Sequence, residues 1–406
     1  MPCRRGPASS TPVEASTIGL GLVAVSLCVH VVTLAAATRA RLRAAPPLAP
    51  AHRRRSVSIL KPLAGEDDEL SRNLESFAAI AHPDFEILLG VASPDDPAAP
   101  IARAFMRRHT ELRARLVVTD PRGAQNPKVS QLIGLAAQAT GEILVVSDSN
   151  VRVTPDYLAR LDEAFAWSAD PRTHPVGLVT SLFVGRGERS LGAALENLHL
   201  TTFVAPAVAT SALFARPFTV GKSMAIAREA LSAIGGFEAG GHELAEDHLL
   251  GRRIGDAGFA VRVSFAPVEN RNVDCDVSRT VERHTRWAKM RRAIAPVPFL
   301  LEPLADPLLL ALVFLALLPS TTSALVFASL VPFKMATSAY SSWLLRGTTL
   351  PWRYLPLELI KSVVMFFCWA RALVSLRIVW RGHPFALAAD SRLMPLAVRR
   401  RRPRRA

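Results

Sequence analysis

Three adjacent polar residues, Asp148, Ser149 and Asn150, are the first candidates for chemistry in this sequence. They follow an apolar run at residues 143–146, which predicts a short buried strand. In open α/β sheets, ligands bind at the carboxyl ends of the strands. A carboxylate and an amide separated by one residue can present oxygen ligands to one face of a divalent cation. Asp, Ser and Asn are also common in turns, so an ordinary strand-to-loop turn is the alternative.

Two further stretches carry charged groups that could serve a site. Glu246 and Asp247 open a predicted helix that runs to about residue 255, and acids at the start of a helix can also act simply as caps. Farther along, Arg283, Arg286 and Trp287 belong to a basic segment at residues 278–292. Arginines interleaved with Trp at helical spacing suit a helix at a membrane interface.

Alternating strands and helices must position these groups. The alternation predicts a mostly parallel sheet covered on both faces, in the Rossmann-like α/β class. No Gly-x-Gly-x-x-Gly motif follows the first strand, so a dinucleotide cofactor is unsupported. We expect strands at residues 56–60, 85–91, 115–119, 143–146, 176–183 and 218–227, and helices at 67–80, 98–109, 128–138, 191–203 and 246–255.

The composition indicates a membrane protein, because 50% of the residues are hydrophobic and only 20% are charged. Residues 18–37 contain a single strongly polar side chain, His30, and are long enough to cross a bilayer as a helix. A signal peptide is the alternative, but the apolar region is longer than a signal core and arginines follow it. We therefore expect an anchor with the next domain in the cytosol.

The C-terminal third contains three more apolar runs, at residues 305–318, 323–345 and 355–379, which we count as two or three spans. Six arginines fall in the last eight residues and predict contact with anionic lipid rather than nucleic acid. A cytosolic C-terminus would require an even number of crossings after residue 300. The four cysteines show no metal or disulfide spacing and are typical of packing residues in a reducing compartment.

Four short motifs occur in an order that resembles the processive and lipid glycosyltransferases of family two. They are Asp95-Asp96, Asp148-Ser149-Asn150, Glu246-Asp247 and Arg283-His284-Thr285-Arg286-Trp287. Longer matches resemble the ceramide glucosyltransferase branch of bacterial type, over roughly residues 56–300. These are Leu60-Lys61-Pro62-Leu63, Asn73-Leu74-Glu75-Ser76-Phe77, Asp95-Asp96-Pro97, Asn126-Pro127-Lys128-Val129-Ser130 and Ser147-Asp148-Ser149-Asn150-Val151-Arg152-Val153.

The resemblance implies a GT-A nucleotide-sugar fold and a role for each motif. Asp148 would hold Mg²⁺ or Mn²⁺ on the donor diphosphate, and Asp247 would be the catalytic base. Asn150 departs from the usual Asp-x-Asp pattern, so Asp148 would carry the metal largely alone. The expected nucleotide-sugar-binding residues are Lys61, Asp96, Lys128, Asp148, Arg283, Arg286 and Trp287, and the acceptor-site candidates are Glu246, His199 and His248. Lys61, Lys128 and Lys222 could instead be solvated lysines, and His248 could be structural.

The expected function is an inverting transfer of a hexose, glucose, from a UDP-sugar to the primary hydroxyl of a membrane lipid, ceramide, giving a β-glycosylceramide. The expected partners are the donor, the lipid acceptor and the bilayer, with no nucleic acid or protein partner. The chain would lie in a bacterial inner membrane with its catalytic domain in the cytosol. The expected segments are a tail (1–17), the anchor (18–38), a basic linker (39–55), the GT-A domain (56–277), an interfacial helix (278–300), a membrane region (301–380) and a basic cytosolic tail (381–406).

Three alternatives remain. A hopanoid-type or other lipid N-acetylglucosaminyltransferase would use the same site with another donor and acceptor. A processive polysaccharide synthase would normally need more spans for a polymer channel. A non-enzymatic membrane scaffold would use the basic tail to bind anionic lipid or nucleic acid.

Overall fold

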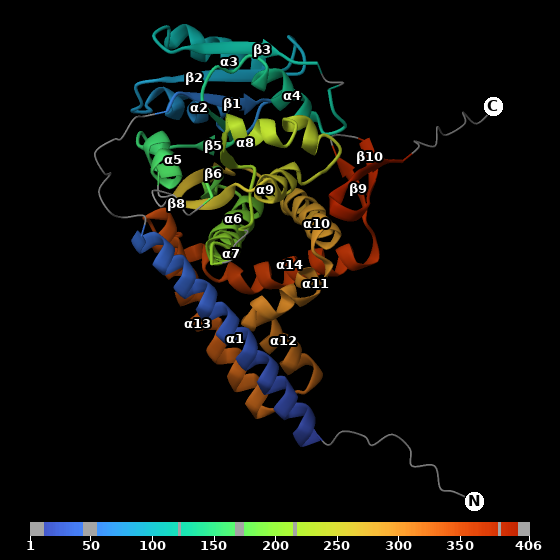
Figure 1. Ribbon diagram of the computed structural model, residues 1–406. Helices are drawn as coiled ribbons and strands as arrows, with labels where there is room; N and C mark the ends of the chain where they lie inside the picture. The colour runs from blue at the N-terminus through green and yellow to red at the C-terminus, as the bar shows by residue number, and fades with distance from the viewer. Residues whose placement is uncertain are drawn as a thin grey trace, which may run out of the picture.

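An eight-stranded mixed sheet is the centre of the larger part of the molecule (Figure 1). The computed structural model describes residues 12–43, 55–120, 123–166, 174–213, 217–380 and 383–396. The strand order is β3-β2-β1-β4-β7-β6-β8-β5. The first four strands in that order run parallel, and β7 is antiparallel to both of its neighbours. The strands are β1 (Val57–Pro62), β2 (Phe85–Val91), β3 (Ala114–Val118), β4 (Ile143–Ser147), β5 (Val151–Arg152), β6 (Val176–Arg186), β7 (Ser223–Ala227) and β8 (Ala260–Arg271).

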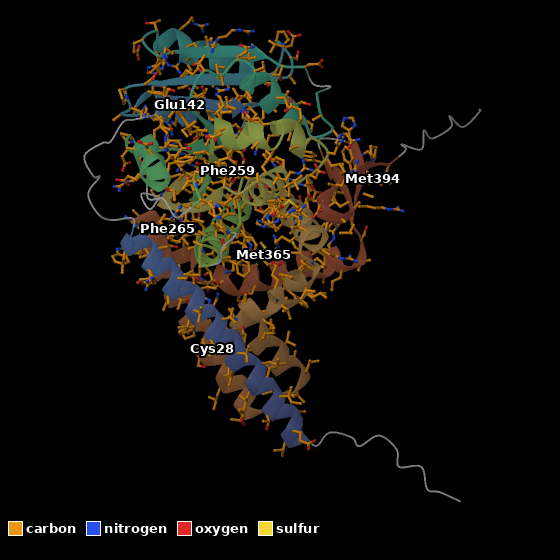
Figure 2. All side chains as sticks on the ribbon, in the orientation of Figure 1. Cys28, Glu142, Phe259, Phe265, Met365 and Met394 are labelled. Carbon is orange, nitrogen blue, oxygen red and sulfur yellow. The ribbon has the colours of Figure 1, made fainter. Side chains whose placement is uncertain are left out.

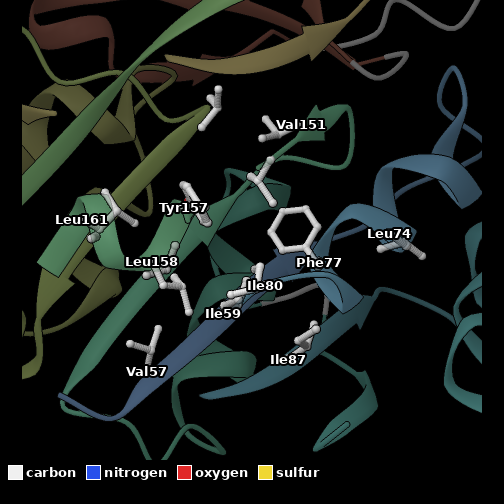
Figure 3. Close-up of a cluster of buried hydrophobic side chains, with 14 of the residues drawn as sticks. Val57, Ile59, Leu74, Phe77, Ile80, Ile87, Val151, Tyr157, Leu158 and Leu161 are labelled. Atoms are coloured by element: carbon white, nitrogen blue, oxygen red, sulfur yellow. The ribbon is translucent and has the colours of Figure 1, made fainter. Parts of the chain in front are cut away.

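Helices cover both faces of this sheet, because successive strand residues point to opposite sides. On one face Ile59 and Ile87 pack under α2 (Leu70–Ala78), α3 (Ala98–Arg108) and α5 (Tyr157–Ala166). Figure 3 shows Phe77 of α2 with Tyr157 and Leu158 of α5 in this cluster. On the other face Leu60 and Leu88 pack against α4 (Pro127–Ala136), α8 (Arg228–Ala233) and α9 (Glu246–Asp256). The α/β fold class predicted from the sequence is confirmed.

Several elements of the sheet half differ from the sequence expectation, and β5 and α5 were not predicted at all. The strand predicted at 218–227 is shorter and begins at Ser223. Strand β8 was not predicted, and its mixed polar and apolar residues pair with β6 only across register shifts. The helix predicted at 191–203 is divided into α6 (Leu191–His199), the π-helix η1 (Leu200–Val204) and α7 (Ala205–Ser211). Pro206 near the start of α7 has no backbone N–H to continue the hydrogen bonding of a regular helix.

The apolar helices form a bundle that projects away from the sheet (Figure 1). In it α1 (Pro12–Arg43) packs with α12 (Pro307–Leu317) and α13 (Thr321–Arg346), and Figure 2 places Cys28 part-way along α1. Within the described ranges, Val13–Leu42 is the one helix long and apolar enough to cross a membrane. A bent pair, Pro296–Ala305 with Pro307–Leu317, would be a second if it acts as one span. The predicted number of C-terminal spans and the even number of crossings remain predictions.

Two helices lie between the sheet and the bundle. The basic helix α10 (Val277–Ile294) packs along α14 (Leu357–Val374), which crosses beneath the sheet domain in Figure 1. Helix α14 corresponds to the last apolar run of the sequence, yet it buries Glu358, Lys361 and Ser362. The short α11 (Pro296–Leu301) and the 3-10 turn η3 (Glu302–Ala305) connect α10 to the bundle.

The segment assigned from the sequence to a basic tail, residues 381–406, is structured over residues 383–396. There β10 (His383–Leu387) pairs with β9 (Arg377–Trp380) and β11 (Leu393–Pro395) in an antiparallel sheet, with the turn η5 (Ala389–Ser391) before β11. Ile378, Leu387 and Leu393 form a small core against Leu244. These strands are short and lie in an arginine-containing segment, so their apolar residues gave no clear strand signal in the sequence. The Arg-rich end itself, like the linker at 44–54, lies outside the described residues.

Candidate active site

Asp148, directly after β4, lies between two lysines. One carboxylate oxygen, Oδ1, is 2.9 Å from Lys128 Nζ, and the other, Oδ2, is 3.1 Å from Lys222 Nζ. Lys128 comes from the first turn of α4, and Lys222 precedes β7, which pairs with β4. Burial opposes the ionisation of Asp148, but the two ammonium groups outweigh it and hold the carboxyl pKa well below its usual range. Asp148 is therefore a fixed negative charge.

Glu246 and Asp247, at the first turn of α9, meet the same lysine. Glu246 Oε1 is 3.0 Å from Lys128 Nζ. Asp247 accepts hydrogen bonds from the backbone N–H groups of Gly221 (2.6 Å) and His248 (2.7 Å). Burial raises the pKa of both carboxyls, and a neighbouring acid adds to the effect in each case. The site thus combines one strongly acidic carboxyl with two that are harder to ionise.

Asn126, to which the sequence assigned no role, links the start of α4 to Glu246. Its Oδ1 caps α4 by accepting from the backbone N–H groups of Lys128 (3.0 Å) and Val129 (3.3 Å). Its Nδ2 donates to Glu243 O (2.8 Å) and to Glu246 Oε2 (3.2 Å). Asn126 occurs in one of the motifs that carry the family resemblance, but its position before Pro127 indicated only a helix cap.

Gly221 closes the site from the side of β7. A Cβ atom added there would lie 2.7 Å from Lys128 Nζ and 3.2 Å from Asp247 Oδ2, so a larger residue would displace the Lys128 ammonium from its place beside Asp247. The Gly221 carbonyl accepts from Lys128 Nζ at 3.2 Å. The neighbouring Lys222 reaches Asn150 Oδ1 at 3.1 Å as well as Asp148.

Lys61 lies beneath Asp148 and is fully buried. Its Nζ donates to Asp148 O (2.9 Å) and Ser147 Oγ (3.2 Å), and it sits 3.9 Å from the centroid of the Phe77 ring. Burial lowers the pKa of Lys61 to about 7. The alternative of a solvated lysine is excluded here, and the ammonium supports the backbone that carries Asp148.

Asp96, at the carboxyl end of β2, has two backbone partners. Its Oδ1 accepts from Gly65 N and from Ala98 N, both at 2.9 Å. The first bond fixes the loop after β1, in which Gly65 has a φ of 69°, and the second lies at the start of α3. Asp96 therefore belongs to the same edge of the sheet as Asp148, but it is engaged by backbone.

The Arg-x-x-Arg-Trp motif lies on α10, next to α6. Arg283 pairs with Glu196 Oε1 at 2.5 Å and donates to Asn272 Oδ1 at 3.3 Å. Trp287 packs against the hydrophobic cluster on the sheet face covered by α2, α3 and α5. Burial, together with the nearby Arg283, lowers the pKa of Arg286. The motif is thus held by an acid and an amide that sequence analysis did not assign, Glu196 and Asn272.

The two candidate histidines have different surroundings. His199 is buried, its ring centroid lies 4.9 Å from that of His284, and burial lowers its pKa well below the usual value. Within the described residues the Nδ1 atom of His199 has no hydrogen-bond partner. His199 lines a small cavity with Lys361 and Asp306, between η1 and α14. His248 lies on α9, with its ring 6.3 Å from that of Phe218, and burial also lowers its pKa.

The oxygen donors of this site suit a hard divalent cation only with help from a ligand. No group of three His, Cys, Asp or Glu side chains within the described ranges is arranged to hold a metal. Asp148 provides one carboxylate, while Asn150 Oδ1 accepts from Lys222. Mg²⁺ is commonly bound through one or two carboxylates together with substrate phosphates. The residues fit a cation shared with a diphosphate.

The mixed α/β sheet gathers acids and lysines at the carboxyl ends of its strands, where ligands bind in open α/β folds. The profile of glycosyl transferase family 21 matches residues 20–393. The chain therefore belongs to glycosyl transferase family 21, and the resemblance to the ceramide glucosyltransferase branch is confirmed.

Two relatives from Caenorhabditis elegans are similar over most of the chain. Ceramide glucosyltransferase 3 is 26% identical over 348 residues, which cover 84% of this chain and 74% of the relative. Ceramide glucosyltransferase 1 is 24% identical over 356 residues, with 83% and 72% covered. Among solved structures, a mannosyltransferase from Pyrobaculum calidifontis in complex with GDP-Man and Mn²⁺ is 21% identical, with a TM-score of 0.47, 87% of this chain covered and 99% of that one.

Proposed function

We propose that this chain transfers glucose from UDP-glucose to the primary hydroxyl of a membrane lipid, ceramide, with inversion at the anomeric carbon. The observation that carries the proposal is the convergence of Asp148, Glu246 and Asp247 on Lys128 at the carboxyl edge of the sheet. Family membership supports glycosyl transfer. The two relatives named ceramide glucosyltransferase support the lipid acceptor and the sugar.

The donor diphosphate would bind among Asp148, Lys128 and Lys222. When Mg²⁺ or Mn²⁺ is bound, it neutralises the charge that develops on the leaving diphosphate. The residues of the chain add to this: Asp148 would hold the cation, and the two lysines would turn from Asp148 toward phosphate oxygens. Lys61 would keep the Asp148 backbone in place, since it donates to Asp148 O.

The base would be Asp247. An acceptor hydroxyl is a poor nucleophile and gains from a carboxylate that takes its proton during attack. A raised pKa makes that carboxylate a stronger base, and burial raises the pKa of Asp247. One displacement with one base inverts the anomeric centre, so an α-linked donor gives a β-glycoside.

The remaining candidates divide between nucleotide and acceptor. Asp96 would contact the uracil and ribose, and Arg283, Arg286 and Trp287 would complete the donor site from α10, where Arg suits bidentate phosphate contacts. Glu246, His199 and His248 are the acceptor-side candidates. The unpartnered Nδ1 of His199 and its position next to α14 support a contact with a lipid head group.

The bilayer is the remaining partner. Helices α10 and α14 lie between the sheet and the bundle of α1, α12 and α13, which supports a site at the head-group level (Figure 1). A cytosolic catalytic domain in a bacterial inner membrane is part of this proposal, based on the arginines that follow the anchor.

The test is transfer by purified protein in lipid nanodiscs, with radiolabelled UDP-glucose and ceramide, followed by separation of the lipids. We expect β-glucosylceramide, which a linkage-specific β-glucosidase should hydrolyse. UDP-galactose, UDP-N-acetylglucosamine and extracted bacterial lipids serve as competing donors and acceptors. Absence of glycolipid from ceramide, or faster transfer to another lipid, would contradict the proposed acceptor.

A further inference from the structure

The turn between β10 and β11 holds the loop that leads into α9. Ser391 O accepts from Leu244 N at 3.0 Å, and Ser391 Oγ accepts from Ala245 N, also at 3.0 Å. Leu393 N donates to His242 O at 2.8 Å, and Glu243 forms an isolated bridge with Arg392. The C-terminal sheet therefore reaches the residue directly before Glu246 and Asp247.

This turn has a strained backbone. Asp390 has a φ of 55° and Ser391 a φ of 62°, and within the described part of the chain Glu69 is the one other non-glycine residue with a positive φ. Residues with a Cβ atom adopt this region at an energetic cost, so they keep it only where their surroundings require it. Ser391 is fully buried, and Arg252 of α9 binds both carboxylate oxygens of Asp390, at 2.8 and 3.0 Å.

Helix α9 does not fix its own start. Its N-cap residue is Ala245, which has no side-chain acceptor for the first backbone N–H groups. The loop before it is held from two outside elements instead. On one side Asn126 donates from Nδ2 to Glu243 O and from its backbone N to Gly241 O. On the other side, Ser391 Oγ accepts a hydrogen bond from Ala245 N at 3.0 Å.

The same small sheet also braces α10. Lys289 Nζ donates to Arg377 O at 2.5 Å, and Ala293 packs against the core of Ile378, Leu387 and Leu393. One element thus contacts both helices that carry the candidate site, α9 with Asp247 and α10 with the Arg-x-x-Arg-Trp motif.

We propose that Ser391 is a positioning residue of the glycosyl transfer, because it fixes Ala245 and with it the place of the Asp247 carboxylate. The proposal rests on the proposed role of Asp247 as the base. Asp247 is held at 2.6 Å from Gly221 N, so a shift of the first turn of α9 would move the carboxylate relative to the acceptor hydroxyl. Displacement of a catalytic group by about 1 Å can cost on the order of a hundredfold in rate.

The test is Ser391→Gly in the full-length protein. Glycine tolerates the positive φ, so this variant removes the hydroxyl without adding backbone strain. We expect kcat to fall on the order of tenfold while KM for UDP-glucose changes by less than about twofold, because the donor site is kept. The acidic limb of the kcat–pH profile should also move, since the surroundings of Asp247 change. Ser391→Cys, whose thiol is a weaker acceptor, should give an intermediate kcat.

The matched control is Met394→Ala in the same sheet. Met394 lies on β11 and is 49% exposed (Figure 2), so its replacement should leave kcat unchanged. A Ser391→Gly enzyme with the kcat and pH profile of the wild type would overturn the proposal. An equal loss of kcat and UDP affinity, measured by calorimetry, would also overturn it, because that result indicates general loss of structure.

Failure of this proposal can be told apart from failure of the proposed function. Asp247→Asn with unchanged turnover would remove the base itself, and with it the reason to position it. If Asp247→Asn loses turnover while Ser391→Gly keeps the kcat and pH profile of the wild type, only the positioning role of Ser391 is contradicted.

Discussion

The end of β4 and the start of α9 each bring a half-buried aspartate close to Lys128, but into different surroundings. Asp148 is flanked by two ammonium groups, which lower its pKa. Asp247 instead receives two backbone N–H groups, and its burial, with Asp148 nearby, raises its pKa. Asp148 is therefore held in its charged form, whereas the pKa of Asp247 lies above its usual value.

Such a separation fits the two roles proposed for these residues. A carboxylate that binds a cation must stay ionised, whereas a base must be ready to accept a proton. Pairs of titratable groups with pKa values pushed apart by their surroundings are how acid–base roles are assigned in enzymes. Asp148 directly follows β4 and Asp247 lies in the first turn of α9, so each is at the end of a regular element, and their neighbours in the folded chain distinguish them.

Loss of the base should have the largest effect. We expect Asp247→Asn to reduce kcat roughly a thousandfold, because general base catalysis contributes about 10²–10⁴. UDP binding measured by calorimetry should stay within about twofold, since the amide can still accept from Gly221 N. Turnover near the wild-type level would contradict the role of Asp247 as the base.

Removal of the fixed charge should have the next largest effect. Asp148→Asn leaves Lys128 and Lys222 without their shared partner and removes the single carboxylate that suits a cation. We expect a fall in kcat/KM on the order of a hundredfold and loss of any stimulation by Mg²⁺ or Mn²⁺. The measurement is transfer after chelation and metal re-addition, for the wild type and the variant in parallel. Full wild-type activity in chelator would contradict a metal role for Asp148.

The pH dependence should follow Asp247 and not Asp148. A base works only when deprotonated, so kcat should fall as the pH drops through the raised pKa of Asp247, above the ordinary Asp value of about 4. Asp148 has a lowered pKa and stays ionised over that range, so it should add no limb of its own. A kcat that stays constant down to pH 4 would show that no group with a raised pKa controls the reaction.

The smallest effect should be on the stability of the folded protein, and its sign follows from the raised pKa of Asp247. The folded-state pKa of Asp247 is above its unfolded value, so the stability that this group contributes is present at low pH and is lost as the pH rises through the raised pKa. Asp247→Asn removes the cost of burying the charge. We expect its melting temperature to exceed that of the wild type by about 2 °C at pH 8 and to approach that of the wild type as the pH falls toward the ordinary Asp pKa of about 4. A lower melting temperature at pH 8 would contradict the raised pKa.

The periodic parts of the fold were predictable, because their signals are local. The strand at Phe85–Val91 was predicted with the bounds that it has, and β1, β4, α3 and α4 lie within a few residues of the predicted positions. Continuous apolar runs between turn residues mark buried parallel strands. Strand β8 lacks such a run, and β5 has only two residues, so neither could be read from its own composition.

The candidate site was predictable in its residues but not in its contacts. Asp148, Lys128, Glu246 and Asp247 were assigned from motifs, and the structure brings all four together. Asn126, Glu196 and Asn272 hold those motifs through bonds between residues far apart in the sequence, and no spacing rule identifies such partners. Their roles in the reaction stay proposals, as do those of the motif residues.

By itself, the sequence determined the α/β class, the long apolar helix near the N-terminus and the order of the charged motifs, because hydrophobic periodicity and residue type depend on neighbouring positions along the chain. Only the tertiary structure decided which carboxylate is flanked by lysines and which by backbone N–H groups. It also decided that residues 383–396 meet the start of α9 and do not extend as a tail. Burial and ion pairing depend on groups that the fold brings from distant positions, so the shift of a pKa or the hold on a loop is set by packing and cannot be read from the residue alone.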